Sequence, residues 1–306
     1  MGRLNGRVAI VTGAGNGIGA AIARRFAREG AHVVVNDLGS SPDGTGADAG
    51  PAEGVAKEIR AAGGKALADH GDIADVATGE RLVTTAVEEF GKLDVVVNVA
   101  GILRDRMIFN LGEEDWDAVI RVHLKGHYST VRPAARYFRE QRNPDGNYRI
   151  INFTSVSGLD GSPGQPNYAA AKMGIIGLTY SLAQGLAKYG VTANAIAPGA
   201  ATRLTGTVPE DKKAFKRNDD DPERSPDNIA PLAVFLAGES SGWLSGRTLE
   251  ARGYQVGLYN NPQVIRQITA GGPWDQDTLE QMIDANFRSA ADGLPPSVFA
   301  AQLKRN

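Results

Sequence analysis

Residues 8–19 read Val-Ala-Ile-Val-Thr-Gly-Ala-Gly-Asn-Gly-Ile-Gly, and this stretch decides the fold of the chain. Residues 8–11 form a short apolar run, which is typical of a strand buried on both faces of a parallel sheet. A glycine-rich turn follows, and then apolar residues at helical spacing, Ile18, Ile22 and Phe26. The order of strand, glycine turn and helix predicts a phosphate-binding site at the positive N-terminus of the helix.

The rest of the chain repeats this alternation of strand and helix. Further short β-branched runs occur at residues 33–35, 95–97, 150–151 and 191–196, and the segments between them, such as 76–90, have helical spacing. Repeated strand–helix–strand units imply right-handed crossovers. The sequence therefore predicts an α/β fold with a Rossmann-like, doubly wound parallel sheet and helices on both of its faces.

The composition excludes several classes of function. The chain has 306 residues, a net charge of −2 and no cysteine. The balanced charge provides no basic field for nucleic acid or a membrane surface, and the lack of cysteine excludes disulfides and thiolate catalysis. Four scattered histidines show no metal-ligand spacing with carboxylates, so no metal is expected. No signal peptide or membrane-spanning run is evident, which favours a cytoplasmic protein.

The glycine turn and the residue after the second apolar run predict the cofactor. The turn has the spacing GxxxGxG, and a backbone without side chains there can approach a pyrophosphate closely. Asp37 lies eighteen residues beyond the last of these glycines. Its carboxylate could accept hydrogen bonds from the adenosine ribose and would repel a 2′-phosphate, which favours NAD over NADP. The turn residues expected to contact the cofactor are Gly13, Asn16, Gly17, Ile18 and Gly19.

Three further residues predict the chemistry. Ser155 follows the strand expected at residues 149–153, and Tyr168 and Lys172 are four residues apart in a segment with helical spacing. The phenol and the ammonium should therefore share one helix face, where the ammonium would lower the pKa of the phenol. Tyr168 could then exchange a proton with an alcohol or ketone, Ser155 could stabilise the charge on its oxygen, and Lys172 could also hold the nicotinamide ribose.

About the first 250 residues resemble the short-chain dehydrogenases/reductases. The resemblance rests on the glycine turn, Asp37 and the three residues Ser155, Tyr168 and Lys172. It implies that further segments line the cofactor site: Asp72 and Ile73 beside the adenine, Asn98, Ala100 and Gly101 beside the central strand, Pro198 and Gly199, and Thr202 at the nicotinamide carboxamide. It also implies a homodimer or a homotetramer.

Several stretches resemble a narrower group within this family. Residues 36–39, 100–106, 114–117 and 122–126 are similar to the (3R)-hydroxyacyl-CoA dehydrogenase part of peroxisomal multifunctional enzyme type 2, also called 17β-hydroxysteroid dehydrogenase type 4, and to its bacterial single-domain relatives. The wider family has an asparagine at the position of His123, a fourth catalytic position. His123 is therefore either catalytic or a buried structural histidine, and both interpretations stay open.

The resemblance predicts the organisation and activity of the chain. Residues 1–255 are expected to form the dehydrogenase domain, and residues 256–306 a helical extension without a core of its own that narrows the substrate pocket. The predicted reaction is NAD-dependent interconversion of a secondary alcohol and a ketone, with a 3-hydroxyacyl-CoA or a hydroxysteroid as substrate. The alternatives are an NADPH-dependent 3-oxoacyl-carrier-protein reductase and a non-catalytic nucleotide-binding scaffold.

Overall fold

The computed structural model describes residues 2–200 and 221–295. Its strands are β1 (Val8–Thr12), β2 (His32–Asn36), β3 (Lys65–Asp69), β4 (Val95–Asn98), β5 (Tyr148–Phe153), β6 (Val191–Gly199), β7 (Thr248–Arg252) and β8 (Gln255–Leu258). Its α-helices are α1 (Gly17–Arg28), α2 (Gly50–Ala61), α3 (Val76–Phe90), α4 (Glu113–Ile120), α5 (Gly126–Gln141), α6 (Val156–Asp160), α7 (Pro166–Leu186), α8 (Ala230–Ala237) and α9 (Gln276–Ala291).

The strands form a single sheet in the order β3-β2-β1-β4-β5-β6-β7-β8, in which only the last pair, β7 and β8, is antiparallel. The chain leaves β1 toward one edge of the sheet and returns to β4 on the other side of β1. In such sheets, ligands bind outside the carboxyl ends of the strands at this reversal. The predicted doubly wound sheet is confirmed, and the reversal lies between β1 and β4, where the sequence predicts the cofactor site.

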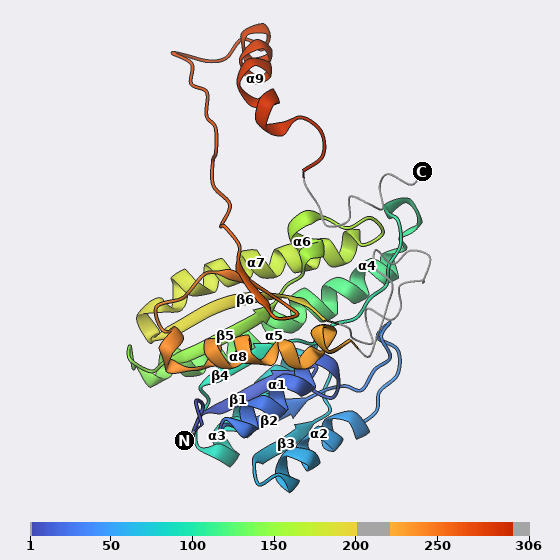
Figure 1. Ribbon diagram of the computed structural model, residues 1–306, viewed down its shortest axis with the longest axis vertical. Coiled ribbons are helices and arrows are strands. Elements are labelled where there is room, and N and C mark those ends of the chain that lie inside the picture. Colours follow the sequence, from blue (N-terminus) through green and yellow to red (C-terminus); the bar gives the residue numbers. More distant parts are fainter. Residues whose placement is uncertain (1, 201–220, 296–306) are drawn as a thin grey trace.

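Each face of the sheet packs against its own layer of helices (Figure 1). Ala9 and Val11 point into a core with α1, α2 and α8, whereas Val8 and Ile10 point into a core with α3, α5 and α7. Successive side chains of a strand alternate between faces, so a strand covered on both sides must be apolar at every position. This requirement explains the unbroken apolar run at the start of β1.

The two edge strands, β3 and β8, were not predicted from the sequence. The edge strand β3 carries Lys65 and Asp69 at its ends, and β8 is almost wholly exposed. An edge strand faces water along one side and does not need the continuous apolar run of a central strand. Their absence from the predicted strands therefore reflects their mixed polarity.

The C-terminal helix α9 confirms the amphipathic helix expected in the extension. It stands away from the rest of the chain at the end of a long connecting segment (Figure 1), and none of its 16 residues is buried. Leu279, Met282, Ile283 and Phe287 nevertheless recur at helical spacing along it. An isolated helix of this length is marginal in water, so its apolar face needs a surface to cover.

No helix in the described part of the chain is both long enough and apolar enough to cross a membrane.

Candidate active site

The glycine turn between β1 and α1 is packed too tightly for side chains. A Cβ at Gly13 would lie 2.7 Å from the Cα of Ala100, and a Cβ at Gly19 would lie 2.1 Å from the carbonyl oxygen of Gly13. Gly13 and Gly17 also have φ angles of +62° and +52°, which residues with a side chain rarely adopt. The bare backbone at the N-terminus of α1 fits a dinucleotide phosphate, because its N–H groups can approach the anion closely.

Asn16 and Ile18 belong to this turn, and their side chains make different contacts. Asn16 is the N-cap of α1, but its side chain makes no capping hydrogen bond. Ile18 is partly buried and packs against the core that α1 shares with the sheet. The side chain of Asn16 can therefore contact a ligand. The side chain of Ile18 packs against the core.

Asp37 directly follows β2 and faces the glycine turn. Its carboxylate accepts hydrogen bonds from the backbone N–H of Gly15 at 2.8 Å and of Gly39 at 2.7 Å. These bonds hold the carboxylate at the rim of the predicted cofactor site, where the sequence analysis expects it to bind the adenosine ribose. The two bonds thus fix a negative charge close to the glycine turn.

The residues expected near the adenine lie after β3. The Asp72 carboxylate is paired with the Arg121 guanidinium at 2.5 Å and also accepts the N–H of Ala74 at 2.9 Å. Ile73 is buried against Gly126 at the start of α5. The Asp72 side chain thus has protein partners, and its position is set by an ion pair between separate segments.

The residues at the end of β4 support the central strand. The buried Asn98 side chain donates to Asn152 of β5 at 3.1 Å and accepts from Thr130 of α5 at 2.6 Å. The Thr12 hydroxyl accepts the backbone N–H groups of Val99 and Ala100 at 3.1 and 3.3 Å. These polar links fasten β4 to both neighbouring strands, and sequence reasoning had not identified the contributions of Thr12 and Thr130.

Ser155, Tyr168 and Lys172 meet beyond the carboxyl end of β5. Ser155 is the N-cap of α6, and its Oγ accepts the N–H of Ser157 at 3.1 Å and forms a hydrogen bond with the Tyr168 phenol. The Lys172 ammonium lies 5.5 Å from the centroid of the Tyr168 ring and donates to the carbonyl of Phe153 at 2.7 Å. The helix α7 therefore brings its two side chains onto one face, beside the serine.

Burial sets the pKa values of both side chains in the free protein. It lowers the pKa of the Lys172 ammonium to about 7. It also raises the pKa of the Tyr168 phenol to about 12, although the Ser155 hydrogen bond acts in the opposite direction. The expected lowering of the phenol pKa is therefore absent here, because burial disfavours the phenolate more strongly than its neighbours favour it.

His123 lies in a π-helical turn, Arg121–Lys125, between α4 and α5. Its imidazole is buried and edge-on to the Tyr168 ring, with ring centroids 5.0 Å apart, and Nε2 lies 2.7 Å from the carbonyl oxygen of Ile102. Gly101 makes room for it, since a Cβ at that position would lie 2.2 Å from the imidazole. His123 thus makes structural hydrogen bonds and also contacts the candidate proton donor.

A second buried histidine was missed by the sequence reasoning. His127 Nδ1 lies 2.6 Å from the carbonyl oxygen of His123, and its Nε2 accepts the N–H of Phe153 at 3.4 Å. Burial lowers the pKa of His127 to about 3 and holds the pKa of His123 well below its usual value. Both imidazoles are therefore neutral near pH 7, and His127 connects the π-helical turn to the peptide that holds Lys172.

The remaining predicted cofactor residues lie at the end of β6. Pro198 and Gly199 are its last two residues and pair with Ala251 and Arg252 of β7. Thr202, expected at the nicotinamide carboxamide, lies outside the described residues.

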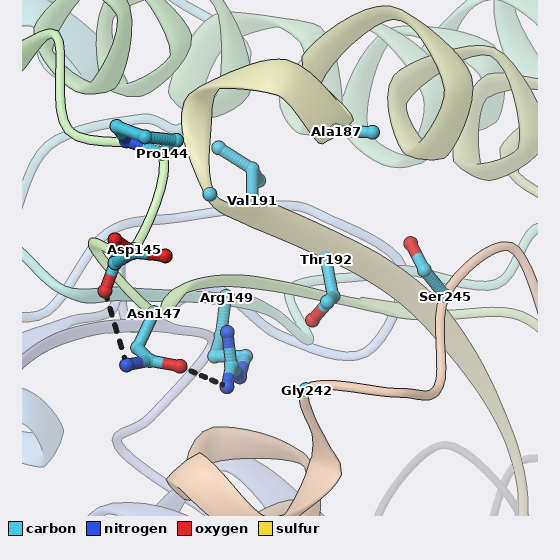
Figure 2. A pocket seen from close by; sticks show the side chains of 10 residues that line it. Pro144, Asp145, Asn147, Arg149, Ala187, Val191, Thr192, Gly242 and Ser245 are labelled. Atoms are coloured by element: carbon cyan, nitrogen blue, oxygen red, sulfur yellow. Dashed lines mark hydrogen bonds between the residues drawn. The ribbon is translucent and has the colours of Figure 1, made fainter.

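A separate cavity lies at the opposite edge of the sheet, at the amino ends of β5 and β6 (Figure 2). It has a volume of about 300 Å³ and is lined by Arg149, Thr192 and Ser245 among others. The buried Arg149 guanidinium donates to the carbonyl of Gly238 at 3.1 Å and to the Asn147 side chain at 3.1 Å. The Arg149 guanidinium thus holds the end of α8. The cavity lies at the amino ends of the strands, away from the predicted site residues, and is not the candidate active site.

The chain is similar in sequence to known dehydrogenases. The sequence profile of the short chain dehydrogenase family matches residues 7–213. The chain is 44% identical to a hydroxyacyl-CoA dehydrogenase, ChsB1, of Mycobacterium tuberculosis, over 90% of this chain and 87% of that one. It is 46% identical to peroxisomal multifunctional enzyme type 2 of Mus musculus, over 78% of this chain but only 30% of that enzyme.

A solved structure agrees with the same assignment. A short chain dehydrogenase from Mycobacterium avium superimposes with a TM-score of 0.84 at 44% identity, and the match covers 97% of this chain and all of that one. The resemblance to the dehydrogenase part of the multifunctional enzymes and to bacterial single-domain relatives is thus confirmed. The chain belongs to the short-chain dehydrogenase family, whose members are oxidoreductases that use a nicotinamide cofactor.

Proposed function

We propose that this protein is an NAD(H)-dependent dehydrogenase that interconverts a secondary alcohol and a ketone, with Tyr168 as general acid and base. The observation that carries the proposal is the meeting of Tyr168, Ser155 and Lys172 at the carboxyl edge of the sheet, the edge on which the glycine turn also lies. In the oxidation, the Tyr168 phenolate would take the hydroxyl proton of the alcohol, and a bound nicotinamide would accept the hydride released as the carbinol C–H bond breaks. In the reduction, the hydride would return to the carbonyl carbon and Tyr168 would return the proton to the oxygen.

Each of the three side chains has a distinct task. Ser155 Oγ accepts the Ser157 N–H, so its hydroxyl can act as a donor, and a bound substrate oxygen would receive this proton in place of the Tyr168 oxygen. The Lys172 ammonium, fixed by the Phe153 carbonyl, supplies positive charge beside the phenol and a donor for the nicotinamide ribose. NAD supplies the hydride acceptor, and its positively charged ring would add to the stabilisation of phenolate.

Asp37 supports NAD in preference to NADP. Its carboxylate is held by two backbone N–H groups at the rim of the crevice, so a negative charge would oppose a 2′-phosphate there. This same charge argues against the reductase alternative, which would require NADPH.

The substrate class is a 3-hydroxyacyl-CoA, with a hydroxysteroid as the second candidate. Ile102, Leu103 and Leu159 follow β4 and β5 on the side of the catalytic residues, which suits an apolar chain or ring system. Arg104 is occupied, because it pairs with Asp115 at 3.4 Å and donates to the carbonyl of Asp43. Arg106 is exposed and donates one N–H to the Asp105 carbonyl at 2.8 Å, and its other N–H groups could bind the phosphates of CoA. The name of the mycobacterial relative favours the acyl-CoA.

The extension supports a homodimer or homotetramer. None of the described residues of its own chain buries the apolar face of α9, and a second copy would provide the surface that it needs. We infer that the helix covers the substrate pocket of a neighbouring subunit. The cytoplasmic location stays a prediction, which fractionation of the cells that produce the protein would test.

Initial rates test this function. NAD or NADP would be supplied with a (3R)-hydroxyacyl-CoA or a 17β-hydroxysteroid, beside a Tyr168→Phe variant. We expect NAD-dependent turnover of the acyl-CoA that disappears in the variant while NADH still binds. Turnover with neither substrate, or equal activity in the variant, would refute the proposal. NADH binding without turnover of any alcohol or ketone would instead favour the scaffold alternative.

A further inference from the structure

A chain of hydrogen bonds links the segment after β4 to Ser155. Gln165 Nε2 donates to Asp105 Oδ2 at 2.8 Å, and the Ser157 hydroxyl donates to Gln165 Oε1 at 2.9 Å. The backbone N–H of Ser157 then donates to Ser155 Oγ at 3.1 Å. Sixty residues separate Asp105 from Gln165 in the sequence, so the fold alone creates this connection.

The direction of each bond in this chain is determined chemically. An ionised carboxylate can only accept, so the Gln165 amide must turn its nitrogen toward Asp105 and its oxygen toward Ser157. The Ser157 hydroxyl must therefore donate. One carboxylate thus orients the Gln165 amide and the Ser157 hydroxyl, and the Ser157 backbone N–H continues the link to Ser155.

The neighbouring residues make Asp105 a rigid anchor. The buried Asn167 side chain donates to the backbone carbonyls of Arg104 and Asp115, both at 3.1 Å, and its oxygen accepts the N–H of Tyr168 at 2.8 Å. The segment that carries Asp105 is therefore fastened to the start of α7, directly before Tyr168.

The Asp105 carboxylate is also placed to act on the Tyr168 phenol. The titratable and charged groups around this phenol are Lys172 from α7, His123 from the π-helical turn, and Asp105, which follows the Arg104 carbonyl that Asn167 fastens to the start of α7. His123 is neutral, and the negative charge of Asp105 raises the pKa of the phenol. Burial raises the pKa of Asp105 itself, opposed by the Gln165 hydrogen bond and the charge of Arg106.

One oxygen of this carboxylate is unused. Asp105 Oδ1 is buried and has no hydrogen-bond partner among the described residues. Such an atom costs free energy, so it needs a compensating role. None of the three catalytic side chains forms a hydrogen bond with it.

We propose that Asp105 is a positioning residue, whose carboxylate holds Ser155 in place through Gln165 and Ser157 and sets one negative charge beside Tyr168. This inference rests on the proposed function of Tyr168. It separates two effects, a hydrogen-bond chain that fixes the geometry and a charge that fixes the pH range of proton transfer.

Asp105→Asn tests the charge. The amide retains an acceptor for Gln165, so kcat should stay within a few-fold of the wild-type value. The rise of kcat/KM with pH in alcohol oxidation should move to lower pH by roughly one unit, because the phenol loses a neighbouring negative charge. Asp117→Asn is the matched control, since it removes an exposed carboxylate from α4 and should leave the profile in place. An unmoved profile in Asp105→Asn would overturn the electrostatic role.

Gln165→Met tests the hydrogen-bond chain. The substitution keeps the Asp105 charge but removes both amide bonds, so kcat should fall about tenfold, with unchanged NADH affinity. Gln141→Met at the exposed end of α5 is the control. Wild-type kcat in Gln165→Met would overturn the positioning role.

Gln165→Glu covers the case in which Asp105→Asn fails to fold. It can still accept from Ser157, but it adds a second negative charge, so the pH profile should move in the opposite direction, to higher pH. A profile that stays in place or moves to lower pH would overturn the electrostatic role.

The failure of this inference can be distinguished from failure of the proposed function. Tyrosine labelled with ¹³C at Cζ, with Tyr168 assigned by the loss of its resonance in Tyr168→Phe, reports the phenol titration without any turnover. An earlier titration in Asp105→Asn is expected even if no substrate has been found. An identical titration would refute the inference independently of the activity.

Discussion

Replacing Gly19 by alanine should damage cofactor binding much more than folding. Gly19 lies in the first turn of α1, and a Cβ there would be 2.1 Å from the Gly13 carbonyl oxygen and 2.9 Å from the Cα of Ala14. Carbon–oxygen contacts in proteins are no closer than about 3.3 Å. The glycine turn and the N-terminus of α1 must therefore separate by roughly 1 Å.

The expected magnitude follows from two opposing contributions. Overpacking of this kind costs about 1–3 kcal/mol, whereas alanine gains about 1 kcal/mol over glycine within a helix. The net loss in the free energy of unfolding should thus be about 1 kcal/mol. Cofactor binding has no such compensation, because the displaced backbone N–H groups form the phosphate site. We expect the Kd for NADH to rise at least tenfold, which corresponds to about 1.4 kcal/mol.

The assay is a titration of NADH fluorescence, combined with thermal unfolding of the same samples. Gly54→Ala is the matched control, because Gly54 is an exposed residue of α2 and a Cβ there would meet no atom within 4 Å. This control should gain stability by about 0.5–1 kcal/mol and bind NADH normally. Wild-type affinity for NADH in Gly19→Ala would refute the assignment of the turn as the phosphate site.

Four further substitutions or deletions test other parts of the account. Tyr168→Phe should lower kcat by about 10²–10⁴-fold with little change in the Kd for NADH, and a loss below tenfold would contradict its role in proton transfer. Asp37→Asn removes the charge that opposes a 2′-phosphate, so the ratio of kcat/KM for NADP to that for NAD should rise about tenfold; an unchanged ratio would be inconsistent with that role. Burial lowers the pKa of His127 to about 3, so its contribution to stability is complete above pH 6.5 and declines as the pH falls toward 3. Between pH 7 and pH 5 the wild-type protein should therefore lose about 2 kcal/mol more than His127→Gln in chemical denaturation, and equal losses would argue against a neutral buried imidazole. Removal of residues 262–306, which include α9, should widen substrate selectivity and weaken self-association, as measured by initial rates and sedimentation; full selectivity would disprove the role of the extension.

The central strands could be predicted from the sequence because a strand covered by helices on both faces must be apolar at every position. Residues 8–11 and 95–97 are apolar throughout, since helices cover both faces of the sheet. The strands β3 and β8 lie at the edges, where alternating or exposed residues are tolerated, and no run of this kind marks them. The helix α9 was predictable because its apolar residues recur at helical spacing whether or not a partner covers them.

The site was predictable where local spacing determines contact. Tyr168 and Lys172 share a helix, so four residues of separation suffice to place them together. Links between distant segments carry no such signal, as Asp105 and Gln165 show. The pKa of Tyr168 was also beyond reach, because the sequence reveals the neighbouring charge but not the degree of burial that outweighs it.

The most direct test of the central claim follows the hydride itself. A (3R)-hydroxyacyl-CoA carrying deuterium at C3 would be incubated with NAD and the protein, and the NADH formed would be analysed by mass spectrometry. Direct transfer beside Tyr168 predicts NADH that is one mass unit heavier, with the label at C4 of the nicotinamide, and none with Tyr168→Phe. NADH without deuterium, or labelling that persists in the Tyr168→Phe variant at the wild-type rate, would contradict the account.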